Sequence, residues 1–133
     1  MNKVICYPRC CTPKYYSDDD YYFEMFTVPE QKINNVGHVG VQLFKELRKS
    51  KIAPTVKALD FTIIAMAVVA ADKAVLRKKS ADGWTRKIEL CIYLHDAPKW
   101  RQEKRKLEEM LRFLSGDFWV FTVNFIFNFR LSE

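Results

Sequence analysis

The residues with the clearest chemical potential lie between Asp72 and Arg86, where charged side chains interrupt an apolar sequence. Asp72 falls on an apolar helical face near the C-terminus of the predicted helix, where the helix dipole disfavours an anion. A carboxylate in that place needs a cation or hydrogen-bond donors, because unpaired burial is costly. Arg86 follows the next turn and can reach back, and its guanidinium suits a bidentate carboxylate contact. We therefore predict a structural ion pair between Asp72 and Arg86 and favour it over a ligand site.

Other reactive residues make weaker sets. Asp72, Asp82 and Glu89 with Lys87 are the only candidates for a small metal-dependent nuclease, and their spacing lacks the usual Glu-x-Lys step. Cys91 with His95 is a still weaker candidate, for a nucleophile–base pair.

Metal and nucleotide sites are not predicted. Cys6, Cys10 and Cys11 with His38 or His95 match no common zinc spacing. The four glycines include no phosphate-binding loop, so we expect no cofactor.

The totals describe one domain with a basic surface. A chain of 133 residues that is 49% hydrophobic can bury a sizeable core. The net charge of +6 permits a nucleic-acid partner, the alternative function that we keep open, and Arg77-Lys78-Lys79 is one basic cluster that would suit it. The sequence predicts no signal peptide, and the longest apolar run, residues 61–71, is shorter than the roughly 20 residues of a membrane span. We expect a cytoplasmic protein without membrane contact.

The elements follow from hydrophobic periodicity. Residues 1–35 are expected to be irregular or β-rich, with a strand over 21–28, and residues 36–133 to form an α+β core within one domain. Helices are expected over 39–49, 56–77 and 97–114, the last with Asp96 as N-cap and Gly116 after its end. Strands are expected over 87–94 and 118–129. We predict a small α+β domain with about three helices on one side of a sheet, ending in a strand–helix–strand unit.

Two helices have predicted buried faces. In the helix over 56–77, Asp72 shares its apolar face with Phe61, Ala65, Val68, Val69 and Leu76. In the helix over 97–114, the buried stripe is Trp100, Leu107, Met110, Leu111 and Leu114.

Three segments of the second half resemble a known family. The first runs from Ala58-Leu59-Asp60 into residues 67–77, AVVAADKAVLR; the second is 82–90, DGWTRKIEL, followed by Asp96 and Trp100; the third is 111–119, LRFLSGDFW. In this order they resemble the N-terminal region of 7-cyano-7-deazaguanine-synthase-like, queuosine-pathway-like proteins of bacterial antiphage defence systems. The motif residues are Asp72, Arg77, Trp84, Thr85, Arg86, Gly116, Asp117 and Trp119. Lys73 stands where the family tends to have Arg, and Leu76 where Pro is frequent.

The resemblance implies a role without catalysis. In those proteins an ATP-using synthase domain follows this region, and its chemistry needs a Ser-Gly-Gly loop that this chain lacks. We therefore expect a non-catalytic accessory or protein-interaction module. Its partner would be the synthase-like domain, a protein substrate or another subunit.

The last predicted strand, over 118–129, is about twice as long as a typical strand. Its apolar far end is expected to extend beyond the domain and to pair with another chain or domain, or with a second copy in a homodimer. The residues of this predicted interaction surface are Ile126, Phe127, Phe129 and Leu131.

Overall fold

A five-stranded parallel sheet organises the chain in the computed structural model, which describes residues 1–27 and 35–126. Its strands are β1 (Asn2–Pro8), β2 (Tyr21–Met25), β3 (Val36–Val39), β4 (Lys87–Leu94) and β5 (Phe118–Phe125), in the order β3-β2-β1-β4-β5. The helices are α1 (Val41–Lys49), α2 (Val56–Ala74) and α3 (Ala97–Ser115), with short 3₁₀ turns η1 (Arg9–Cys11) and η2 (Arg77–Lys79). Each neighbouring pair of strands runs parallel.

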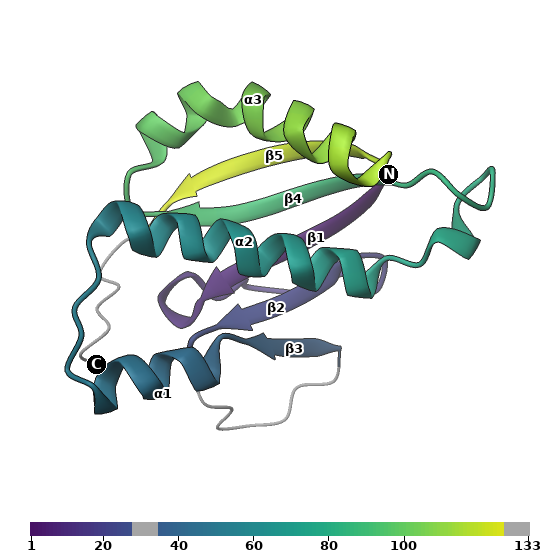
Figure 1. Cartoon of the computed structure of the whole chain (residues 1–133). Helices are drawn as coiled ribbons and strands as arrows, with labels where there is room; N and C mark the ends of the chain where they lie inside the picture. Colours follow the sequence, from purple (N-terminus) through teal and green to yellow (C-terminus); the bar gives the residue numbers. More distant parts are fainter. Residues whose placement is uncertain (28–34, 127–133) are drawn as a thin grey trace.

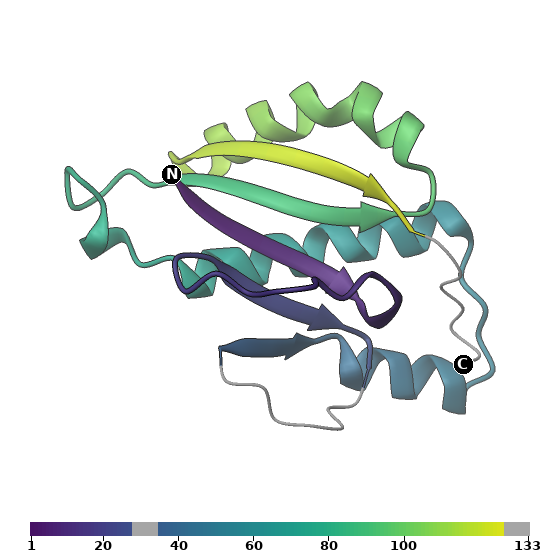
Figure 2. The ribbon, with the colours of Figure 1, turned by 180° about the vertical axis from the view of Figure 1, so that it is seen from behind.

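The three helices lie on one side of the sheet (Figures 1 and 2), and α3 connects the neighbouring parallel strands β4 and β5. The predicted fold class, a small α+β domain with about three helices on one face and a final strand–helix–strand unit, is therefore confirmed. The face turned toward the viewer in Figure 2 carries no helix of the described chain.

The described part of the first 35 residues contributes two strands to the same sheet as the rest. They supply β1, which is the middle strand and pairs with both β2 and β4, and they supply β2 itself. Alternation along β1 places Val4 and Cys6 in the core under the helices. The β-rich N-terminal segment is thus as central to the core as the strands that follow.

Alternation along the strands also builds the rest of the core. Ile88, Leu90, Ile92 and Leu94 of β4 and Trp119, Phe121 and Val123 of β5 are buried under the helices. From α2 come Leu59, Ile63, Ile64, Ala67 and Ala71, and from α3 Trp100 and Leu111. The alanines of α2 allow close approach of the helix to the sheet.

Two predicted helical faces need correction. In α2, the residues that share a face with Asp72 are largely exposed, among them Phe61 and Val69, because the helix turns a different stripe toward the sheet. Leu76, which was expected on this face, lies beyond the end of α2 and is also exposed. In α3, Met110 and Leu114 are exposed although they were expected in the buried stripe. Each helix packs against the sheet through one stripe only, so a residue near the edge of its apolar face remains in solvent.

The ends of two elements also differ from expectation. α2 ends at Ala74, and Arg77 starts the separate turn η2. β5 is described to Phe125, and Ile126 after it is buried in the core with its N–H donating to the Leu94 carbonyl. Ile126 is therefore not part of an exposed overhang; Phe127, Phe129 and Leu131 lie outside the described residues. Among the described residues, no helix is both long and apolar enough to cross a membrane.

Candidate functional site

The eight motif residues gather at the amino end of β4 and β5, and their centre is Asp117. Its carboxylate is fully buried and accepts two hydrogen bonds from Arg77, each at 2.9 Å. It also accepts from Arg86: the backbone N–H at 2.9 Å, Nε at 3.2 Å and Nη2 at 2.7 Å. Two arginines thus neutralise one buried carboxylate with paired, charge-assisted bonds.

Arg86 joins this centre to the end of α2. Its Nη1 donates to the Asp72 carbonyl at 2.9 Å and to the Val75 carbonyl at 2.7 Å. Carbonyl groups in the last turn of a helix have no partner within the helix, and a cation there opposes the negative end of the helix dipole. Arg86 therefore fixes where α2 ends and holds that end against β4.

The predicted contact between Asp72 and Arg86 is present in the structure, but Asp72 is not buried. Arg86 Nη2 lies 2.6 Å from Asp72 Oδ1, and the Asp72 side chain is 58% exposed. The buried carboxylate that pairs with Arg86 is Asp117, which lies 31 positions further along the chain. Sequence reasoning found Asp117 as a motif residue and missed its role, since no local spacing connects it to Arg86.

The electrostatics agree with this geometry. Burial of Asp117 by itself would raise the pKa of its carboxyl, but the bonds from Arg86 and the charge of Arg77 outweigh it and lower the pKa. Burial likewise would lower the pKa of Arg86, and the hydrogen bonds to Asp117 and Asp72 raise it instead. Asp117 and Arg86 therefore both stay charged at neutral pH.

Residues 76–86 connect α2 to β4 and include η2; this connection protrudes beyond the sheet in both views, and we call it the arm (Figures 1 and 2). Asp82 organises it, because one oxygen accepts from the N–H groups of Trp84 and Thr85 and from the Ser80 hydroxyl. These bonds lower the pKa of Asp82 to about 2. Gly83 takes the positive φ of 73° that the turn requires.

Trp84 stands on this arm and is 69% exposed. The Arg77 guanidinium lies 5.3 Å from the centre of its ring, and Arg77 Nη1 also donates to the Trp84 carbonyl at 2.9 Å. Because Arg77 is itself anchored on Asp117, the exposed indole is connected to the buried centre through two ordered contacts.

The third motif segment supports the same centre from the α3 side. Gly116 ends α3 in the left-handed conformation. The Ser115 hydroxyl accepts from the Trp119 indole N–H at 2.9 Å and from the Asp117 N–H at 3.1 Å. The motif residues therefore form one connected structure, and every carboxylate oxygen of Asp117 is used within it.

A second buried carboxylate, Asp60, lies at the opposite end of the sheet and was missed by sequence reasoning. It accepts from the N–H and from Nδ1 of His95, both at 2.8 Å, and from the Asp96 N–H at 2.9 Å. Burial alone would raise the pKa of Asp60, and these hydrogen bonds lower it. Asp60 thereby joins α2 to the end of β4 and the start of α3.

The residues considered for a nuclease or a nucleophile pair do not assemble into such sites. Asp72 pairs with Arg86, and Asp82 holds the arm turn. Glu89 accepts from Cys91 at 3.5 Å, while His95 faces Asp60. Within residues 1–27 and 35–126, no group of three or more His, Cys, Asp or Glu residues could hold a metal ion.

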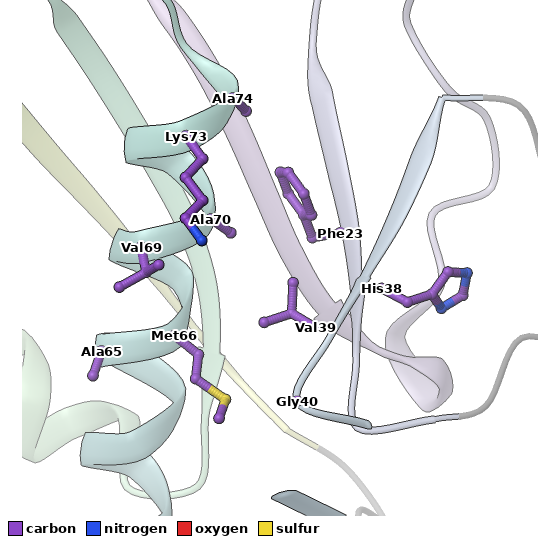
Figure 3. A pocket seen from close by; sticks show the side chains of 10 residues that line it. All are labelled: Phe23, His38, Val39, Gly40, Ala65, Met66, Val69, Ala70, Lys73 and Ala74. Carbon is purple, nitrogen blue, oxygen red and sulfur yellow. The ribbon is translucent and has the colours of Figure 1, made fainter. Parts of the chain in front are cut away.

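One groove of about 680 Å³ runs beside α2 (Figure 3). Phe23 and Val39 reach into it from the strands, and Met66 and Lys73 border it on the helix, while the His38 ring points away from α2. The groove exists because α2 lies over the middle of the sheet and leaves β2 and β3 partly uncovered. It contains no clustered polar groups that would position a reacting substrate.

Comparison with known proteins adds no assignment: no family model matches the chain, and no curated protein or solved structure matches it significantly.

Proposed function

We propose that this chain is a non-catalytic protein-interaction module of a bacterial antiviral defence system. The partner is a deazaguanine-synthase-like domain, which follows this region in the proteins that the sequence resembles. The observation that carries the proposal is a parallel sheet with helices on one face only. Parallel sheets are normally covered on both faces, because the crossover connections between their strands place helices there.

The face without helices is covered only over part of its width. The loop after β1 folds over the β1–β2 side, where the Tyr7 and Tyr16 hydroxyls lie 3.2 Å apart and the Tyr16 ring meets Tyr22 edge-on. These contacts bury Tyr7 and Tyr22. The chain therefore closes one half of this face by itself.

The side of this face along β5 and the neighbouring part of β4 is more open, and we call it the uncovered sheet surface, although Cys91 of β4 is buried there. It presents Glu89 and Tyr93 of β4 and Phe118, Val120, Thr122 and Asn124 of β5. Val120 is 36% exposed at its centre. Mixed apolar and polar side chains on an open sheet are the composition that a partner domain can cover with few unpaired polar groups.

The charged centre among the motif residues also supports a role without catalysis. The charged centre around Asp117 is saturated by its own arginines, which leaves it a structural role. An accessory module needs a stable surface and no reacting group, and this is what the motif residues provide.

The test is titration calorimetry between the purified chain and a synthase-like domain encoded in the same genome. We expect Val120→Lys to weaken the complex at least tenfold, because a charge would be buried at the centre of the contact. Val69→Lys is the matched control, since Val69 is 52% exposed on α2, on the opposite side of the sheet. It should bind as the unchanged chain does.

Two outcomes would contradict the proposal. If Val120→Lys and Val69→Lys bind equally well, the contact does not use the uncovered sheet surface. If no complex forms and light scattering shows instead a self-associated chain that Val120→Lys makes monomeric, the occupant of the surface is a second copy.

A further inference from the structure

Two exposed aromatic rings lie at the amino end of β4 and β5, each beside an arginine. The Arg77 guanidinium lies 5.3 Å from the ring centre of Trp84, and the Arg112 guanidinium 3.9 Å from that of Phe118. Trp84 is 69% exposed and Phe118 45%. Arginine over an aromatic face, with the ring still open to solvent, is an arrangement that can continue into a stack with a further planar group.

Lysines surround these rings. Lys78 and Lys79 in η2 and Lys87 at the start of β4 are exposed, and none of them forms an ion pair with an acidic side chain of residues 1–27 or 35–126. Of the acidic residues nearby, Asp117 and Asp72 pair with the arginines. Asp82 accepts only from uncharged donors of the arm and keeps its charge, but the three lysines outnumber it. The unneutralised charge at this edge is therefore positive.

The rings are also held in place before any ligand binds. The arm is fixed by Asp82, and Arg77 is fixed on the buried Asp117 by two bonds. A preordered aromatic surface loses little conformational entropy on binding, so more of the stacking free energy appears as affinity.

We propose that this edge of the sheet binds single-stranded nucleic acid, with bases stacking on Trp84 and Phe118 and phosphates meeting Lys78, Lys79 and Lys87. Basic residues interleaved with exposed aromatic rings are the general composition of such surfaces. A protein partner fits less well, because lysine is depleted in protein interfaces. This site adjoins the uncovered sheet surface, because Phe118 lies at the amino end of that surface, but the binding does not depend on the proposed protein partner.

The spacing suits a short strand. Lys87 pairs with Phe118 across β4 and β5, and Trp84 precedes Lys87 by three positions, which reach at most about 11 Å. Stacked bases are a few ångströms apart, so both rings can be reached within a few nucleotides. The contact is made through base faces and phosphates, which gives little sequence preference.

The experiment uses the unchanged chain and 15-nucleotide oligo(dT) and oligo(rU). Tryptophan fluorescence reports the contact, because Trp100 and Trp119 are buried and Trp84 is the exposed indole. We expect both oligonucleotides to quench it at low salt. Fluorescence anisotropy of a labelled oligonucleotide then gives affinities for variants. Trp84→Ala should weaken binding about tenfold, which corresponds to the value of one stacked base.

The charge contribution is tested by Lys78→Glu with Lys79→Glu. This variant should lose most of the affinity and reduce the slope of log K against log salt by about 1.4, as expected for two phosphate contacts. Lys45→Glu with Lys49→Glu is the matched control, since both lysines are exposed on α1, far from the arm (Figure 1). It makes the same change in net charge and should retain binding within about threefold.

Several results would overturn the proposal. One is the absence of quenching by both oligonucleotides at 50 mM salt and 100 μM strand. Another is equal affinity of Trp84→Ala and the unchanged chain, with circular dichroism showing both folded. A third is quenching by heparin as strong as that by oligo(dT), because heparin has charge without bases. Quenching by oligo(dT) alone would support the proposal and assign DNA, and quenching by oligo(rU) alone would assign RNA.

Discussion

At the residue scale, Asp117 has the largest structural role of the motif residues. One buried carboxylate receives five hydrogen bonds from two arginines, and through them connects β4, β5, the end of α2 and the arm. Asp72 belongs to the same network but is exposed, so water can replace the hydrogen bond that Asp72 accepts from Arg86. Removal of the Asp117 carboxylate should therefore lower the free energy of unfolding more than removal of the Asp72 carboxylate.

We predict that Asp117→Asn lowers the free energy of unfolding by about 3 to 5 kcal/mol, because it leaves two arginine charges without their buried partner. Asp72→Asn should cost less than about 1 kcal/mol, as for an ion pair open to water. Urea unfolding followed by circular dichroism measures both. Equal losses for the two variants would show that the network does not centre on Asp117.

The chemical character of this site could be predicted from the sequence, and its geometry could not. An arginine just after a turn can be expected to bind the preceding helix, which identified Arg86 and Asp72. The contacts with Asp117 and between Asp60 and His95 join residues 31 and 35 positions apart. No local periodicity connects such positions, so only the packed chain shows them.

At the element scale, two helix ends depend on glycine for its positive φ, and one of them also has no space for a side chain. Gly40 precedes α1 with φ of 80°, and Gly116 follows α3 with φ of 77°. A Cβ on Gly40 would lie 2.7 Å from the Phe26 ring, whereas one on Gly116 would meet nothing within 4 Å. The backbone requirement is the same, and only Gly40 also needs the space.

Gly116→Ala is predicted to destabilise by about 1 to 2 kcal/mol, which is the cost of the left-handed conformation for a residue with a Cβ. Gly40→Ala should add about 1 to 3 kcal/mol to this, since the Phe26 ring must move in a packed core. Thermal or urea unfolding of the two variants under identical conditions makes the comparison. If Gly116→Ala is the more damaging change, the close contact at Gly40 is incorrect.

The elements themselves were largely predictable, because alternation and helical periodicity act over short distances. The helix over 97–114 and the strand over 87–94 were expected almost as found, with the Asp96 side chain accepting from the Lys99 N–H. The buried stripes were less predictable. Met110, Leu114 and Val69 are apolar and exposed, because a one-sided sheet covers only a narrow part of each helix.

At the scale of the whole molecule, the reactivity of the four cysteines can test the strand order of the sheet. Cys6 on β1 and Cys91 on β4 are buried at its centre, although they are far apart in the sequence. Cys10 is exposed and Cys11 partly so, both in η1. Burial raises the pKa of Cys6 to about 12, with a small contribution from Cys91, so its thiolate is scarce at neutral pH.

With an aromatic disulfide reagent at pH 8, we predict that Cys10 and Cys11 react in the native protein and that Cys6 and Cys91 react only at the rate of unfolding. In 6 M guanidinium all four should react. Mass spectrometry of the labelled peptides identifies which thiols have reacted, and Cys10→Ser with Cys11→Ser gives the matched control. Rapid native labelling of Cys6 would mean that β1 is not the central strand.

The sequence by itself determined the class of the fold, the approximate elements and the residue types gathered in the motifs, because these depend on patterns within one helix or strand. It also gave the resemblance from which the proposed partner follows. The tertiary structure alone decided that β1 is the central strand, that the helices leave one sheet face open, and that Asp117 rather than Asp72 is the buried carboxylate. The reason is physical: strand order and the burial of a charge are set by contacts between segments distant in sequence, which form only when the core packs.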